Sequence, residues 1–211
     1  MKKKPFSIEE ALRFAYDMMR DNIGLFFKIF LINLFLFTVG ILINNYFIIP
    51  GTNDITTTGN FLIFLLYVLE IIVNIGFLGI FLNLHDKKKT SIEDVFSKYK
   101  MFFKYFIASF LYALIVMGGL ILFIVPGIIW GIKFRYFKFL IVDKNLDPIT
   151  ALKKSAEITQ GVKLDLYIFG LIMFVLQIAG LMTFGIGLFF IIPVVWMAET
   201  FIYRKLAVRI K

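Results

Sequence analysis

The sequence has no cysteine and a single histidine, His85. Without cysteine the chain can form neither a disulfide nor a thiolate metal site, and thiol catalysis is excluded. A single histidine also rules out a histidine-rich metal site, so we expect neither a metal nor a cofactor. Phosphate-binding loops, the Gly-x-Ser-x-Gly turn of hydrolases and paired His-Glu motifs are missing as well. These absences predict a protein without catalytic activity.

Charged residues are scarce for a chain of 211 residues. They make up 18% of the sequence against 60% hydrophobic residues, and the mean hydropathy is +0.88. Twenty-seven phenylalanines add to the apolar content. A soluble chain of this length would need more polar residues to cover its surface. The composition therefore predicts one integral membrane domain over residues 1–211.

Lysine and arginine are missing from the segments 44–62, 117–128 and 182–193, whose only charge is Asp54. All 23 Lys and Arg residues lie in or next to the segments 1–28, 87–104, 133–163 and 204–211. This alternation follows the positive-inside rule and predicts that both termini are cytosolic. Long apolar runs join the two kinds of segment, so six spans are predicted near 23–49, 61–84, 101–123, 124–145, 164–184 and 186–206.

The net charge of +9 predicts different partners for a soluble protein and for a membrane protein. In a soluble protein it would suggest nucleic acid as a partner. Because the charge is confined to the predicted cytosolic side, we expect the lipid bilayer, with anionic headgroups at that face, and no nucleic acid. The predicted location is the plasma or inner membrane.

Three cytosolic segments begin alike, at Ser7, Ser91 and Asp147. Ser7 and Ser91 are each followed three positions later by an acid, and Asp147 precedes a proline, so each segment has the signature of a helix start. The residues that follow predict short amphipathic helices that lie at the membrane surface. The expected fold is therefore an all-α, six-transmembrane-helix bundle with three cytosolic amphipathic interfacial helices.

The order of cap, amphipathic helix, span and proline turn occurs three times along the chain. It favours three repeated helix-plus-hairpin modules at 7–84, 91–145 and 147–206, all in the same orientation. The alternative is that any six-helix protein with cytosolic amphipathic helices shows this order.

The segment 122–161 carries a more specific pattern. It contains Pro126-Gly127-Ile128-Ile129, then Lys133, Arg135 and Asp143, then Ala151-Leu152-Lys153-Lys154-Ser155 and Ile158-Thr159-x-Gly161. This pattern resembles an uncharacterised family of prokaryotic six-span membrane proteins that includes the membrane domain of some glycerophosphodiester phosphodiesterases. The resemblance implies a six-span fold, a Pro-Gly turn before the fourth span and an amphipathic helix before the fifth. It implies no known reaction, and the residues it marks as structural are Pro126, Gly127, Ala151, Leu152, Ser155 and Gly161.

Polar side chains inside the predicted spans are costly in lipid and are therefore the candidate site residues. Counting inward from the outer turns places Glu70 and Lys133 about 13 Å deep, and Lys138 and Glu199 about 20 Å deep. The full candidate set is Glu70, Asn74, Lys133, Arg135, Lys138, Gln177 and Glu199. One interpretation is a set of structural ion pairs that hold the fourth span between the second and the sixth. The other is a polar cavity that binds an anionic substrate or relays protons.

The sequence favours a non-catalytic membrane protein that organises or regulates a membrane partner, or senses lipid. The partner could be another membrane protein or a second copy of this chain. The alternative function is a small transporter or permease for an anionic or lipid-like solute that uses the buried Glu, Lys and Arg residues. A water-sized cavity lined by Glu70 and Arg135 would favour the alternative, whereas a dry and fully paired cluster would favour the first function.

Overall fold

The computed structural model describes residues 6–49, 52, 54–183 and 186–209, and every named element among them is a helix. This confirms the predicted all-α class. The α-helices and the two short 3₁₀ helices follow in the order α1 (Ile8–Asp21), α2 (Ile23–Tyr46), α3 (Thr57–His85), η1 (Ile92–Phe96), η2 (Tyr99–Met101), α4 (Phe102–Leu122), α5 (Ile124–Phe134), α6 (Phe137–Lys144), α7 (Pro148–Ile158), α8 (Lys163–Met182) and α9 (Ile186–Ala207).

Within the described residues, four helical segments are long and apolar enough to cross a membrane. They are Ile23–Tyr46, Thr57–His85, Ile92–Leu122 and Lys163–Met182. Each covers all or most of one of the predicted first, second, third and fifth spans. A helix needs about 20 apolar residues to cross the hydrocarbon layer, and each of these segments reaches that length. The fold is thus compatible with a membrane protein.

Large apolar side chains on these helices face outward. The exposed fractions are 66% for Phe35 and 65% for Phe37 on α2, and 73% for Phe103 on α4. An aromatic surface of this kind is unfavourable in water, because soluble proteins rarely expose large continuous apolar patches. Lipid chains around the helices would remove that cost, which accords with the membrane interpretation.

The predicted fourth span, 124–145, is not one helix. It is broken into α5, of 11 residues, and α6, of 8 residues, with Arg135 and Tyr136 between them. Neither piece is long enough to cross a bilayer alone. The predicted sixth span corresponds to α9, which has 22 residues with Pro193 inside the helix. Six complete spans therefore remain a prediction.

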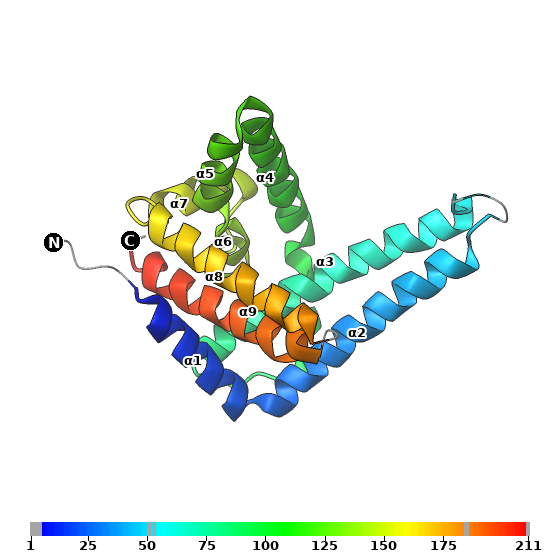
Figure 1. Ribbon diagram of the computed structural model, residues 1–211, viewed down its shortest axis with the longest axis horizontal. Coiled ribbons are helices and arrows are strands. Elements are labelled where there is room, and N and C mark those ends of the chain that lie inside the picture. The colour runs from blue at the N-terminus through cyan, green and yellow to red at the C-terminus, as the bar shows by residue number, and fades with distance from the viewer. Residues whose placement is uncertain (1–5, 50–51, 53, 184–185, 210–211) are drawn as a thin grey trace.

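Three hairpins, α2–α3, α4–α5 and α8–α9, diverge from a shared base (Figure 1). In this view the tip of α2–α3 points to the right, the tip of α4–α5 points up, and that of α8–α9 points to the lower right. The helix α1 lies along α9, and the start of α1 and the end of α9 lie near each other on the left. The α4–α5 hairpin thus takes a direction of its own.

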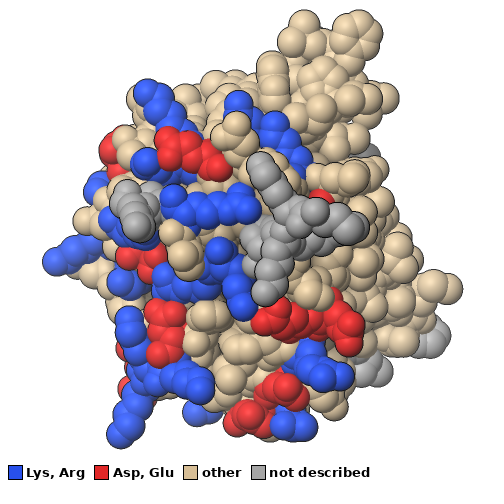
Figure 2. Space-filling model, turned by 90° about the vertical axis from the view of Figure 1, so that its left-hand side faces the viewer, with Lys and Arg blue, Asp and Glu red and all other residues tan. Residues whose placement is uncertain are grey.

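The base of the hairpins is also where the core lies. The last third of α3, all of α6 except its charged residues, and the second half of α9 contribute fully buried side chains, among them Leu78, Ile80, Phe139, Leu140, Tyr203 and Leu206. Lys and Arg side chains gather on the left-hand face of this base, with Asp and Glu among them, as Figure 2 shows. The base of the hairpins therefore presents a charged face, as expected from the basic segments of the sequence.

Two of the three predicted amphipathic helices are present. In α1 the Ser7 hydroxyl accepts a hydrogen bond from the Glu10 N–H, and in α7 the Asp147 carboxylate accepts one from the Thr150 N–H. The Thr150 hydrogen bond lowers the pKa of Asp147 below its ordinary value. Their apolar faces are buried inside the protein, with Ala11 and Ala15 of α1 and Ala151 of α7 fully covered. The stripes that we expected to face lipid thus pack on α9 and α6 instead.

The prediction of an amphipathic helix after Ser91 is wrong. Ser91 and Asp94 do form a capping box, but it starts the five-residue 3₁₀ helix η1 rather than an amphipathic α-helix. The backbone of η1 lies directly against α3 at Gly76. Because this module also ends in the broken pair α5 and α6, the segment 91–145 differs from 7–84 and 147–206 at both ends. The three-module repeat is therefore not confirmed.

Candidate functional site

The break between α5 and α6 positions the site. A helix end leaves backbone N–H and C=O groups without partners in the helix, and buried ones must be satisfied elsewhere. The Lys133 carbonyl accepts hydrogen bonds from the Ser155 hydroxyl at 3.2 Å and the Thr159 hydroxyl at 3.0 Å. The Tyr136 N–H donates to the Ser155 oxygen at 3.1 Å. Two hydroxyl groups of α7 therefore stabilise the break.

Arg135 at this break forms an ion pair with Glu199 of α9, and Lys138 of α6 pairs with the same carboxylate at 3.3 Å. All three side chains are mostly buried, with exposed fractions of 21% for Arg135, 26% for Lys138 and 13% for Glu199. One interpretation of the sequence was a set of ion pairs between the fourth span and its neighbours, and the pairs with Glu199 of the predicted sixth span are of this kind. The cluster holds two cations and one carboxylate, which leaves one formal positive charge.

Aromatic rings surround the two cations. The Arg135 guanidinium lies 6.0 Å from the ring centre of Phe169 in α8, and the Lys138 amine lies 5.3 Å from that of Trp196 in α9. The faces of aromatic rings attract cations, more so where water is excluded. These rings hold the positive groups without neutralising them, so the excess charge persists.

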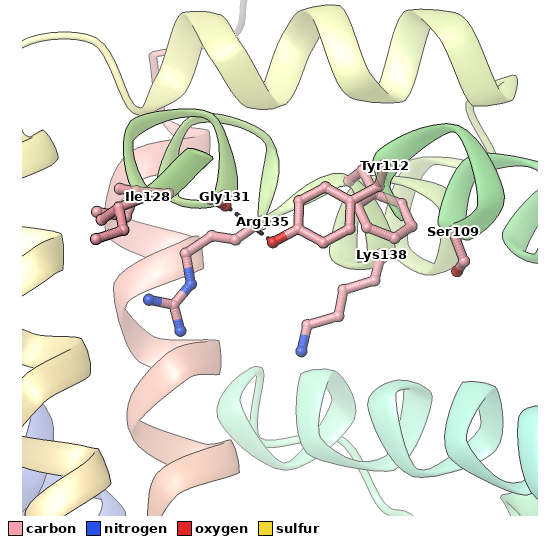
Figure 3. Close-up of a pocket in the computed structure, with 8 residues that line it drawn as sticks. Ser109, Tyr112, Ile128, Gly131, Arg135 and Lys138 are labelled. Carbon is pink, nitrogen blue, oxygen red and sulfur yellow. Dashed lines mark hydrogen bonds between the residues drawn. The ribbon is translucent and has the colours of Figure 1, made fainter. Parts of the chain in front are cut away.

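A pocket of about 460 Å³ opens beside the two cations, between α4 and the α5–α6 pair. Figure 3 shows Arg135 and Lys138 projecting into the same open space, with Tyr112 and Ser109 of α4 along its side. The Tyr112 hydroxyl donates to the Gly131 carbonyl at 3.0 Å, which fastens α4 to α5 across the pocket. The pocket is lined by Ser109, Tyr112, Ile128, Gly131, Ile132, Arg135, Phe137 and Lys138.

The other predicted site residues lie elsewhere. Glu70 lines a separate pocket of about 320 Å³ between α2 and α3, and among the contacts of the described residues it has no ion pair. Lys133 lies over the ring of Phe134, and Gln177 is exposed on α8. Asn74 donates to the Glu70 carbonyl at 2.8 Å. The predicted grouping of Glu70 with Lys133 is therefore wrong, because the hairpins α2–α3 and α4–α5 that carry these residues diverge (Figure 1).

A second ion-pair network was missed by the sequence reasoning. Arg204 of α9 donates to Asp86 at the end of α3 and to Asp143 of α6, both at 2.7 Å. The Tyr203 hydroxyl also donates to Asp143 at 2.7 Å. These residues fasten the three core helices together at the charged base. Sequence reasoning selected charged residues deep inside the predicted spans, and these residues lie near span ends among many other charges. Only Asp143 was singled out, as part of the 122–161 pattern.

The residues marked by that pattern have clear structural roles. Pro126 and Gly127 lie in the first turn of α5, where a missing N–H costs nothing, and Gly127 packs against Gly119 of α4. Ala151, Leu152 and Ser155 form the buried face of α7. Gly161, with a φ of +80°, follows α7 in a conformation that side chains rarely adopt.

Comparisons of the chain with protein-family models, with curated proteins and with solved structures find no match. The resemblance of the 122–161 segment to the prokaryotic six-span family therefore stays a prediction, and function has to be argued from the pocket itself.

Proposed function

We propose that this protein is a multi-pass membrane protein that binds an anionic, lipid-like solute in the pocket beside Arg135 and Lys138, without catalysing a reaction. The observation that carries the proposal is the excess of positive charge at an open pocket. Two cations share one carboxylate, Glu199, and both project toward a space of about 460 Å³. Small-molecule sites typically have volumes of about 300–1,000 Å³, so the pocket is large enough for a ligand.

Electrostatics favours an anion as the occupant. An unbalanced charge at membrane depth is costly, and the cost falls when an opposite charge with good geometry is brought beside it. Arginine is suited to this task because its planar guanidinium can bind carboxylate or phosphate oxygens through two donors. Ser109 lines the same pocket and adds a hydroxyl group for further hydrogen bonds.

The broken helix supports passage of the solute over simple storage. Transporters often place their binding sites at interrupted spans, where the chain can change its conformation around a bound ligand. Here Arg135 lies at the break between α5 and α6, and Lys138 follows within the first turn of α6. Organisation of a membrane partner or of a second copy, which the sequence favoured, would use the contact surface of the cytosolic helices, but the apolar faces of α1 and α7 are buried inside the protein. The pocket is lined by Arg135 and Lys138 and not by Glu70, and its open space beside two cations supports the alternative function better.

The charged face at the base of the hairpins supports a cytosolic position for both termini in a plasma or inner membrane. An impermeant maleimide added to intact cells should label a cysteine introduced as Thr57→Cys, which lies at the start of α3. The variant Lys88→Cys should be labelled only after the membrane is opened. Both positions are exposed, and the natural chain has no cysteine to interfere. The reverse pattern would show that the orientation is wrong.

Binding should depend on the charge of the ligand and on both cations. We expect purified protein in dodecyl maltoside to capture radiolabelled hexadecyl phosphate in a scintillation proximity assay, and hexadecylphosphocholine to compete poorly. Arg135→Gln and Lys138→Gln should each weaken capture about tenfold or more, since a hydrogen bond to a charged group contributes about 1.5–3 kcal/mol. Each variant keeps one cation beside Glu199, so the fold should persist.

The matched control is Lys28→Gln, which removes an exposed cation of α2 that does not line the pocket. It should leave capture unchanged. Equal capture of the phosphate and the phosphocholine, or capture that neither pocket variant reduces, would show that the pocket does not recognise anions.

A further inference from the structure

A second pocket of about 400 Å³ lies on the other side of α5, between α5 and the start of α8. Its lining is mainly aliphatic, with Val125, Ile128, Ile129 and Ile132 of α5 opposite Leu164 of α8. The polar groups in it are Lys163 and Tyr167. From Val125 to Ile132 this apolar groove follows α5 for about 10 Å. A surface of this shape and composition suits a hydrocarbon chain.

The apolar groove and the pocket beside Arg135 and Lys138, here called the cationic pocket, meet at α5. Ile128 and Ile132 line both of them, and Arg135 follows Ile132 by one helical turn. A guanidinium nitrogen of Arg135 lies 3.8 Å from the position that a Cβ at Gly170 of α8 would take. The cation therefore reaches from the polar pocket toward α8, the helix that forms the other wall of the groove.

We propose that the two pockets form one bipartite site for a single-chain amphiphile of the bilayer with a phosphate headgroup. The headgroup lies between Arg135 and Lys138, and the chain crosses Ile132 and Ile128 into the groove between α5 and α8. This inference rests on the proposed function, and it adds the chemical class of the ligand. Charge complementarity selects the head, and the shared aliphatic wall selects the tail. The groove alone would not select the headgroup, and the pocket beside the two cations alone would not select the chain.

Chain length tests the inference. In the same capture assay, hexadecyl phosphate should bind at least about tenfold more tightly than butyl phosphate, because each buried methylene adds to affinity. Ile129→Trp fills the groove without touching the cationic pocket. It should weaken the binding of hexadecyl phosphate about tenfold and leave the binding of butyl phosphate unchanged. Val125→Trp, at the other end of the groove, is a second variant in case the first fails to fold. Val175→Trp, at an exposed position of α8 outside both pockets, is the matched control.

The outcomes separate the two proposals. If capture of hexadecyl phosphate depends on Arg135 but neither groove variant reduces it, the bipartite site is wrong and the proposal of anion binding stands. If the groove variants weaken hexadecylphosphocholine as strongly as hexadecyl phosphate and Arg135→Gln weakens neither, the groove binds chains without a headgroup site, and both proposals fail. Equal affinity for butyl and hexadecyl phosphate also contradicts the bipartite site.

Discussion

Glu199→Gln is expected to lower the free energy of unfolding by about 3–5 kcal/mol, the usual cost of removing one partner from a buried ion pair. Glu199 is the shared partner of Arg135 and Lys138, so its neutralisation leaves two largely buried cations without a counter-charge. Thermal unfolding in neutral detergent, followed by circular dichroism, should show a large drop in Tm. An unchanged Tm would show that the cluster does not hold α9 to the α5–α6 pair.

The matched control is Glu70→Gln, a replacement of the same chemistry at a half-buried position of α3. Because Glu70 has no ion pair among the described contacts, it should change stability by less than about 0.5 kcal/mol. Depth counting along the sequence treated the two carboxylates alike, and the structure separates them. A loss of stability for Glu70→Gln equal to that for Glu199→Gln would remove this distinction.

The variant Glu199→Gln also connects stability to binding. If an anion occupies the pocket, hexadecyl phosphate should stabilise Glu199→Gln more than the natural protein, since the phosphate supplies the negative charge that the variant lacks. Butyl phosphate should do so more weakly if the chain adds affinity. Stabilisation of both proteins to the same extent would indicate that the ligand binds away from Glu199.

Sequence reasoning was accurate where the physical signal is local and strong. Apolar runs of membrane length predicted the segments that contain α2, α3, α4 and α8, and the partition of Lys and Arg predicted one charged face. The caps at Ser7 and Asp147 start helices as expected. These features depend on neighbouring residues, and packing between distant helices does not alter them.

It failed where distant parts of the chain decide the outcome. The break after Phe134 has no proline or glycine to announce it, because hydroxyl groups of Ser155 and Thr159 satisfy the exposed backbone from another helix. Depth counting assumed one straight span from 124 to 145, so it aligned Lys133 with Glu70. The direction of the α4–α5 hairpin depends on packing against α7 and α8, which the sequence pattern did not reveal.

Gly76→Ala is expected to destabilise the protein by about 3 kcal/mol, because a Cβ at this position would overlap the Val95 carbonyl oxygen. The obstacle is backbone, and η1 cannot easily move away. Its start is held by the Asp94 carboxylate, which accepts from the Ser91 N–H and the Thr90 hydroxyl, both at 2.9 Å. Val95 itself is buried against α3. The measurement is again Tm in neutral detergent.

Gly118→Ala in α4 is the matched control, since nothing lies within 4 Å of the Cβ that it would add. Alanine has the better helix propensity, so this change should leave stability equal or raise it by up to about 1 kcal/mol. A general intolerance of larger residues in the spans would lower Tm in both variants. Loss of Tm in Gly76→Ala alone would instead show that the close contact of η1 with α3 fixes where the chain leaves the α2–α3 hairpin. That exit determines the direction in which α4 departs, and α4 forms one wall of the cationic pocket.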